Sequence, residues 1–221
     1  MLLNIHIAPG AGIYPRQKLS FSLMIRKLAS NYPLLLLLGF NLYFIWYYNR
    51  HPDGFKTLLL IYWFQSVAIG FFTFLQLLTT PAEQTTGLIT DQNTGKPIGK
   101  GCGALFFAVH YGIFHLVYLV FLVVRDGGPI DFLLLKISFF IILVAELMEF
   151  IRKRKAISVN KVNQGFAFFL PYLRIIPMHI MIVGAAFLNL SDVTIFLVLK
   201  TVADVGMYVL TNALYFQTNK S

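Results

Sequence analysis

The sequence predicts an all-α integral membrane protein, a helical bundle with six transmembrane helices, and three observations support this. The chain of 221 residues is 57% hydrophobic and only 12% charged, with a mean hydropathy of +0.72. Soluble domains carry about 25% charged residues, so this composition excludes an ordinary soluble domain. Six apolar runs approach the length of about 20 residues that a helix needs to cross a bilayer. Lys and Arg are frequent in every second loop between these runs and scarce in the loops between.

The predicted spans follow one another along the chain without an evident internal repeat. They comprise Tyr32–Tyr48, Thr57–Thr79, Gly103–Val124, Pro129–Ile151, Phe166–Leu190 and Asp192–Phe216. The first span is the shortest. The fifth contains Pro177, which has no N–H and clashes with the carbonyl of Leu173. A kink there would free a carbonyl group at membrane depth, and a kink that serves only helix packing is the alternative.

The loops and termini divide the basic residues unevenly. Twelve Lys and Arg lie on the side of the N-terminus, the second and fourth loops and the C-terminus, against three on the other side. The positive-inside rule then predicts a multi-pass protein of the inner (cytoplasmic) membrane with both termini in the cytoplasm. Residues 1–31 would be a cytoplasmic segment, residues 32–216 the six-span domain and residues 217–221 a cytoplasmic tail.

The N-terminal segment has an apolar stripe at helical spacing, formed by Phe21, Met24, Ile25 and Leu28. With its basic neighbours this stripe indicates a short interfacial helix on the inner leaflet, and a frayed basic tail is the alternative. At the opposite face we expect an aromatic belt. Its members are Trp46, Tyr47, Tyr48, Tyr62 and Trp63.

The formal charge of +9 would indicate a nucleic-acid partner only in a soluble protein. Here the basic residues fall between apolar runs, which is typical of a membrane protein that faces anionic lipid. The expected partner is therefore the lipid bilayer and not nucleic acid. A homo-oligomer stays open, and the sequence identifies no protein partner. The single cysteine, Cys102, excludes an internal disulfide.

Ionisable residues within the spans are where function is to be sought. A charge at the centre of a membrane helix costs about 2.5–3.5 kcal/mol, so such residues usually face a bundle interior and have a partner. Lys200, Asp204 and Tyr208 recur every four residues and so share one helix face. His110 and His115 are five residues apart, which turns them toward different sides of their helix.

Depth counting, at about 1.5 Å per helical residue, sorts the polar side chains into two layers. The inner layer holds His110, Glu146, Glu149 and Arg174, with Glu146 expected to pair with Arg174. The central layer holds His115, His179, Lys200, Asp204 and Gln65.

Together these layers predict a polar centre that binds a divalent metal or small polar ligand, or relays protons through His and Asp. The candidates for ligand binding or proton relay are His110, His115, Glu146, Arg174, His179, Lys200, Asp204, Gln65 and Tyr208. For a metal they narrow to His110, His179, Asp204 and Glu146. An intramembrane metal-dependent enzyme and a structural protein with a purely stabilising ion-pair network are the alternatives; the sequence leaves the cofactor and the existence of an enzymatic activity open.

Four patches of the sequence carry a family resemblance. They are Tyr62–Gly70, Val109–Phe114, Pro171–Arg174 with His179, and Lys200–Asp204. From about Leu35 onward the chain resembles a bacterial and archaeal family of multi-pass membrane proteins classed as a domain of unknown function. The resemblance implies a membrane architecture and the location of a site. It implies no activity.

The chain departs from that family's pattern at four positions. Gln65 stands where the pattern has Glu, and Tyr118, Glu146 and Tyr208 stand where members carry His. The positions that match form the core of the resemblance: His110, Arg174, His179, Lys200 and Asp204.

Overall fold

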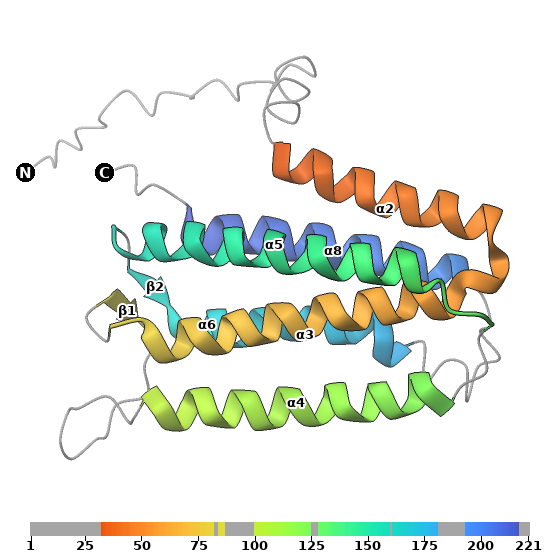
Figure 1. Ribbon diagram of the computed structural model, residues 1–221. Helices are drawn as coiled ribbons and strands as arrows, with labels where there is room; N and C mark the ends of the chain where they lie inside the picture. The colour runs from red at the N-terminus through yellow and green to blue at the C-terminus, as the bar shows by residue number, and fades with distance from the viewer. Residues whose placement is uncertain are drawn as a thin grey trace, which may run out of the picture.

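The computed structural model describes residues 32–81, 84–86, 100–124, 128–159, 161–180 and 193–216, and these are almost entirely helical (Figure 1). The all-α class is therefore confirmed. The elements are α2 (Tyr32–Arg50), η1 (Pro52–Gly54), α3 (Phe55–Thr79), β1 (Thr85–Thr86), α4 (Lys100–Val124), α5 (Phe132–Ile157), β2 (Val162–Asn163), α6 (Gln164–Phe169), η3 (Leu170–Arg174) and α8 (Val193–Tyr215).

The helices lie where the apolar runs predict them. Among the described residues, three stretches are long and apolar enough to cross a membrane, namely Pro52–Thr79, Gly101–Val124 and Phe196–Tyr215. By this measure of length and composition, α2 and α5 do not qualify, so six transmembrane helices remain an expectation. The predicted interfacial helix and most of the loop between α3 and α4 lie outside the described residues.

Helix α5 begins later and ends later than the sequence predicts. Asp131 caps its start, since its Oδ1 accepts a hydrogen bond of 2.9 Å from the backbone N–H of Leu134. The helix then continues beyond Ile151 through the basic run to Ile157. Arg154 and Lys155 occupy its last turn, where cations interact favourably with the helix dipole.

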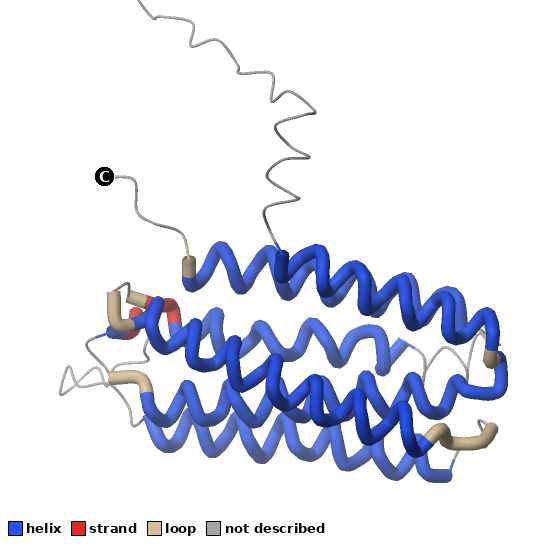
Figure 2. The backbone as a smooth tube through the Cα atoms, turned by 45° about the horizontal axis from the view of Figure 1, so that its top comes forward, coloured by secondary structure: helices blue, strands red, loops and turns tan. Residues whose placement is uncertain are grey.

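Helix α3 is the central element of the bundle. It packs against α4 and α5 and contacts both α6 and η3, while α2 packs against α8 and α8 against η3. Figure 2 shows the helices running side by side, with the two short strands at one end of the bundle. We call this end the strand end, and the opposite end, where η1 joins α2 to α3, the η1 end.

The strands form a minimal parallel ladder, in which Thr85 pairs with Val162 and Thr86 with Asn163. This ladder ties the segment after α3 to the segment after α5. At the opposite end, the hydroxyl of Tyr47 donates to Asp131 over 3.3 Å, and Thr57 Oγ1 accepts from the N–H of Asp131 over 3.0 Å. Each end of the bundle is therefore held by contacts between segments that lie far apart in the sequence.

The fifth predicted span is not one regular helix. Its described part runs from α6 through the 3-10 segment η3 and is helical again over residues 175–180. Pro171 is the second residue of η3, and Pro177, which is fully buried, lies three residues after the end of η3. Two prolines that cannot donate a backbone hydrogen bond account for this irregular stretch.

Candidate functional site

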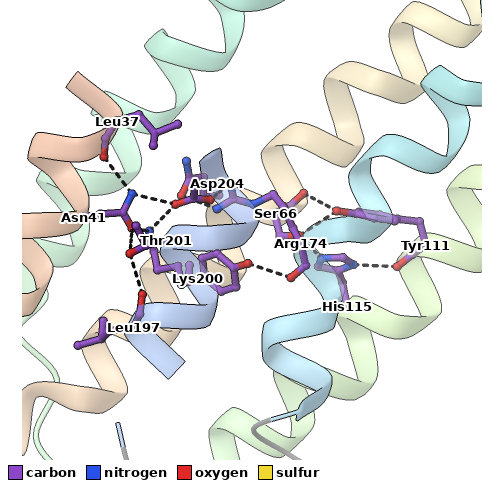
Figure 3. Close-up of polar contacts among 12 residues, drawn as sticks. Leu37, Asn41, Ser66, Tyr111, His115, Arg174, Leu197, Lys200, Thr201 and Asp204 are labelled. Atoms are coloured by element: carbon purple, nitrogen blue, oxygen red, sulfur yellow. Dashed lines mark hydrogen bonds and ion pairs between the residues drawn. The ribbon is translucent and has the colours of Figure 1, made fainter. Parts of the chain in front are cut away.

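Three charged side chains meet in the core of the bundle. Asp204 of α8 accepts hydrogen bonds from Arg174 Nη1 at its Oδ1 and from Lys200 Nζ, 2.7 Å away, at its Oδ2. All three residues are at most 3% exposed. We call Arg174, Lys200 and Asp204 the triad; Figure 3 shows its side chains turned toward one another.

Asn41 brings α2 into contact with the triad. Its amide nitrogen donates to Asp204 Oδ2 over 3.2 Å and to the carbonyl of Leu37 over 2.9 Å, while its oxygen accepts from Lys200 over 2.8 Å. The hydroxyl of Thr201 lies 3.3 Å from the same amide oxygen. Asn41 thus bridges the anion and one cation of the triad, as a buried amide with both a donor and an acceptor can.

Arg174 is held by α3 as well as by Asp204. Its Nη2 donates to Gln65 Oε1 over 2.7 Å, and its backbone carbonyl accepts a 2.9 Å hydrogen bond from the hydroxyl of Tyr62. The guanidinium carbon lies 4.7 Å from the centre of the Tyr62 ring, a favourable cation–π distance. Its Nε is buried and has no hydrogen-bond partner in the structure.

The charges of the triad do not cancel. With all three groups ionised, two cations face one carboxylate, which leaves one net positive charge. Each ion removed from water carries a penalty of several kcal/mol, which only close pairing and further hydrogen bonds offset. The rings of Phe44 and Tyr62 lie 5.0 and 5.4 Å from the Lys200 ammonium and relieve part of this excess.

A second polar network joins α3 to α4, beside the triad (Figure 3). His115 Nδ1 lies 2.9 Å from the carbonyl of Tyr111, and its Nε2 lies 2.9 Å from Ser66 Oγ. The Ser66 hydroxyl is in turn 2.8 Å from that of Tyr111. Because a carbonyl only accepts, Nδ1 carries the proton, and a neutral imidazole then accepts from Ser66 at Nε2. Both ring nitrogens of His115 are therefore used within the protein.

The other two candidate histidines, His110 and His179, lie on the exposed seam between α4 and the fifth helical segment. His110 Nδ1 is 2.8 Å from the hydroxyl of Tyr172, and His179 Nδ1 is 3.2 Å from that of Tyr118. Each helical segment thus supplies one His and one Tyr. His110 and His179 are both exposed, so the structure does not bring them to the triad.

Two cavities accompany these networks. One of about 200 Å³ lies between α3 and α4 and is mostly apolar, with Tyr111 and His115 in its lining. The other, of about 10 Å³, lies between α3 and α5 and includes Glu146 and Glu149. Tyr208, one turn beyond Asp204, is half-buried.

The two predicted layers are wrong where they separate Arg174 from the central residues. Arg174 contacts Gln65 and Asp204, and its ion pair is with Asp204 rather than with Glu146. The irregular segment accounts for part of the error. Residues in η3 rise about 2.0 Å each, compared with about 1.5 Å in an α-helix, so Arg174 lies deeper than regular counting places it.

The predicted metal set does not converge. His110 and His179 face the exposed seam, Asp204 is engaged by two cations, and Glu146 lines the small cavity. Among the described residues, no group of three His, Cys, Asp or Glu side chains has the arrangement of a metal site. The arrangement of the described residues therefore does not support a metal site built from this set.

Several residues of these networks were absent from the sequence-based candidates. Tyr62, expected in an aromatic belt, is fully buried against the triad. Asn41 could have been found, because an amide in the middle of an apolar span needs a partner as a charge does. Ser66 and Tyr111 gave no such signal beyond their positions in the patches of family resemblance.

The comparison with family models confirms that the chain belongs to a family of unknown function. Residues 24–219 match the model of a family of unknown function, DUF6498. No curated protein and no solved structure matches the chain.

Proposed function

We propose that this chain, which belongs to the family of unknown function DUF6498, is a multi-pass membrane protein. In this proposal it relays protons through the triad. Of the three predicted functions, metal binding, ligand binding and proton relay, a relay needs the least free space around the buried charges, because only protons have to pass. It needs a group that can exist with and without its proton in the same surroundings.

The exposed surface supports a membrane position for more than the three most apolar helices. Leu42 of α2 is 65% exposed and Phe140 of α5 is 69% exposed, although neither helix is among the three that qualify as spans by length and composition. Soluble monomers rarely expose apolar patches larger than a few hundred Å². Large apolar side chains are exposed on every long helix of the described chain, including Phe71, Val123 and Val202, and Ile176 of the fifth helical segment is exposed as well. A bilayer around the whole bundle would cover them.

The net positive charge of the triad is the observation that carries the relay proposal. Arginine does not give up its proton in proteins, whereas a buried lysine readily does. Loss of one proton from Lys200 would leave Arg174 and Asp204 as a neutral pair, without any movement of the backbone. The centre therefore has two states that differ by a single proton, and the excess positive charge shifts the balance between them toward the state with a neutral lysine.

The test is proton uptake by sealed proteoliposomes that enclose a pH-sensitive dye, driven by a potassium diffusion potential. We expect uptake with the wild type and its loss in Lys200→Met, because methionine fills the same space without a titratable nitrogen. Lys136→Met is the matched control, since Lys136 is an exposed lysine of α5. Normal uptake in a folded Lys200→Met protein would contradict the proposal.

A structural clamp is the second candidate, favoured by the full engagement of the Asp204 carboxylate. Its oxygens contact Arg174 of η3, Lys200 of α8 and Asn41 of α2, which joins three helical segments. If this is the only role of the triad, the wild-type protein conducts no protons and the variants lose stability alone.

A further inference from the structure

The small cavity between α3 and α5 is polar although it lies within the bundle. Its lining includes Thr73 and Gln76 of α3 and Glu146, Glu149 and Lys153 of α5. Its volume is about 10 Å³. A buried water needs about 10–15 Å³ measured in this way and two to four polar partners, so the cavity suits a single water molecule.

The cavity lies between the strand end and the triad. At the strand end, the Lys153 ammonium is 5.4 Å from the ring of Tyr215, which places these two residues at one level. Glu146 is seven residues before Lys153, hence about 10 Å deeper in the bundle. Asp204 is eleven residues before Tyr215, hence about 16 Å deeper. Glu146 therefore lies more than half-way from that end to Asp204.

Charged residues lie on both sides of Glu146, toward the strand end and toward the triad. Its carboxylate interacts electrostatically with Lys153, toward the strand end, and with Arg174 of the triad. Glu149, one turn closer to the end, is held by Arg152 at 2.8 Å and by Lys153 at 3.9 Å. Both glutamates are half-buried and line the cavity, but Glu149 is already engaged in an ion-pair cluster with Arg152 and Lys153.

We propose that Glu146, with one water in this cavity, is the entry point through which protons pass from the strand end to the triad. The inference rests on the proposed relay function. A protonated water in the cavity gives its proton to the Glu146 carboxylate, which becomes a neutral acid and returns the water. The acid then releases the same proton toward the triad, where neutral Lys200 takes it up, and Glu146 is a carboxylate again.

The experiment measures proton uptake in the same proteoliposomes for Glu146→Gln, which keeps the shape and removes the titratable group. Uptake is expected to fall by about two orders of magnitude, the usual contribution of a positioned proton-transfer group. Glu146→Asp, which keeps the carboxyl, is expected to restore most of it. Asp53→Asn, an exposed carboxylate at the η1 end, is the matched control and keeps normal uptake.

A second variant guards against a folding defect. Thr73→Val keeps the side-chain volume but removes one polar partner of the water, and it is expected to slow uptake without changing the unfolding temperature. Normal uptake in a folded Glu146→Gln protein overturns the entry route and leaves the relay standing. A wild-type protein without any uptake overturns the relay itself.

Discussion

At the scale of single residues, Asp204 is the counter-ion that compensates the two buried cations, Arg174 and Lys200. It is the only anion of the triad, and its two oxygens accept from Arg174, Lys200 and Asn41. Removing one partner of a buried ion pair leaves an uncompensated charge, which costs more than the loss of the contact alone. The three members of the triad should therefore respond very differently to neutral substitution.

Asp204→Asn leaves two buried cations without an anion, and we expect a loss of about 3–5 kcal/mol in the free energy of unfolding. Lys200→Met leaves the Arg174–Asp204 pair, which is balanced, and its loss should be smaller. Denaturant unfolding of the purified protein in detergent, followed by circular dichroism, measures both. Equal losses in the two variants would contradict the imbalance of charge in the triad.

At the scale of elements, the contact between α3 and α4 depends on a glycine. A Cβ added at Gly70 would lie 2.3 Å from Cε1 of the Tyr111 ring, which itself is fixed by hydrogen bonds to Ser66. Tyr111 cannot move away without breaking the network that holds His115. The two helices can thus approach closely because Gly70 has no side chain, and the hydroxyl of Tyr111 holds them there through its hydrogen bonds to Ser66.

Gly70→Ala is therefore expected to destabilise the protein by about 1–3 kcal/mol, the usual range for overpacking a well-packed interface. Gly112→Ala on α4 is the matched control, because nothing lies within 4 Å of its added Cβ, and alanine favours a helix. Thermal unfolding in detergent separates the two. A Gly112→Ala protein that is as unstable as Gly70→Ala would argue against the Tyr111 contact as the cause.

At the scale of the whole molecule, the sign of the loop charges predicts how the bundle is oriented. The strand end carries the basic run Arg152–Lys155 at the end of α5, and this is the end that the positive-inside rule assigns to the cytoplasm. Anionic lipid at that surface would attract the same run. Orientation is testable with the single cysteine of the chain.

Cys102 is exposed near the start of α4, so an impermeant maleimide should label it only after the cytoplasmic face is opened. The double variant Cys102→Ser/Asp53→Cys moves the thiol to the η1 end and should be labelled in intact cells. A reporter fused after Ser221 is expected to be active in the cytoplasm. Labelling of wild-type Cys102 in intact cells would reverse the predicted topology.

The sequence by itself determined the helical class, the positions of the helices and the fact that charges are buried, because apolar length and the scarcity of charge are local properties. It also placed Lys200 and Asp204 on one face, since their spacing repeats that of the helix. Only the tertiary structure decided which helices meet. The pairing of Arg174 with Asp204, the bridge through Asn41 and the separation of His110 and His179 from the centre depend on helix rotation and on the irregular rise of η3. Helix rotation is not encoded in any one segment, because it follows from how side chains of different helices pack against one another, whereas the two prolines mark the irregular stretch without fixing which residue it brings to Asp204.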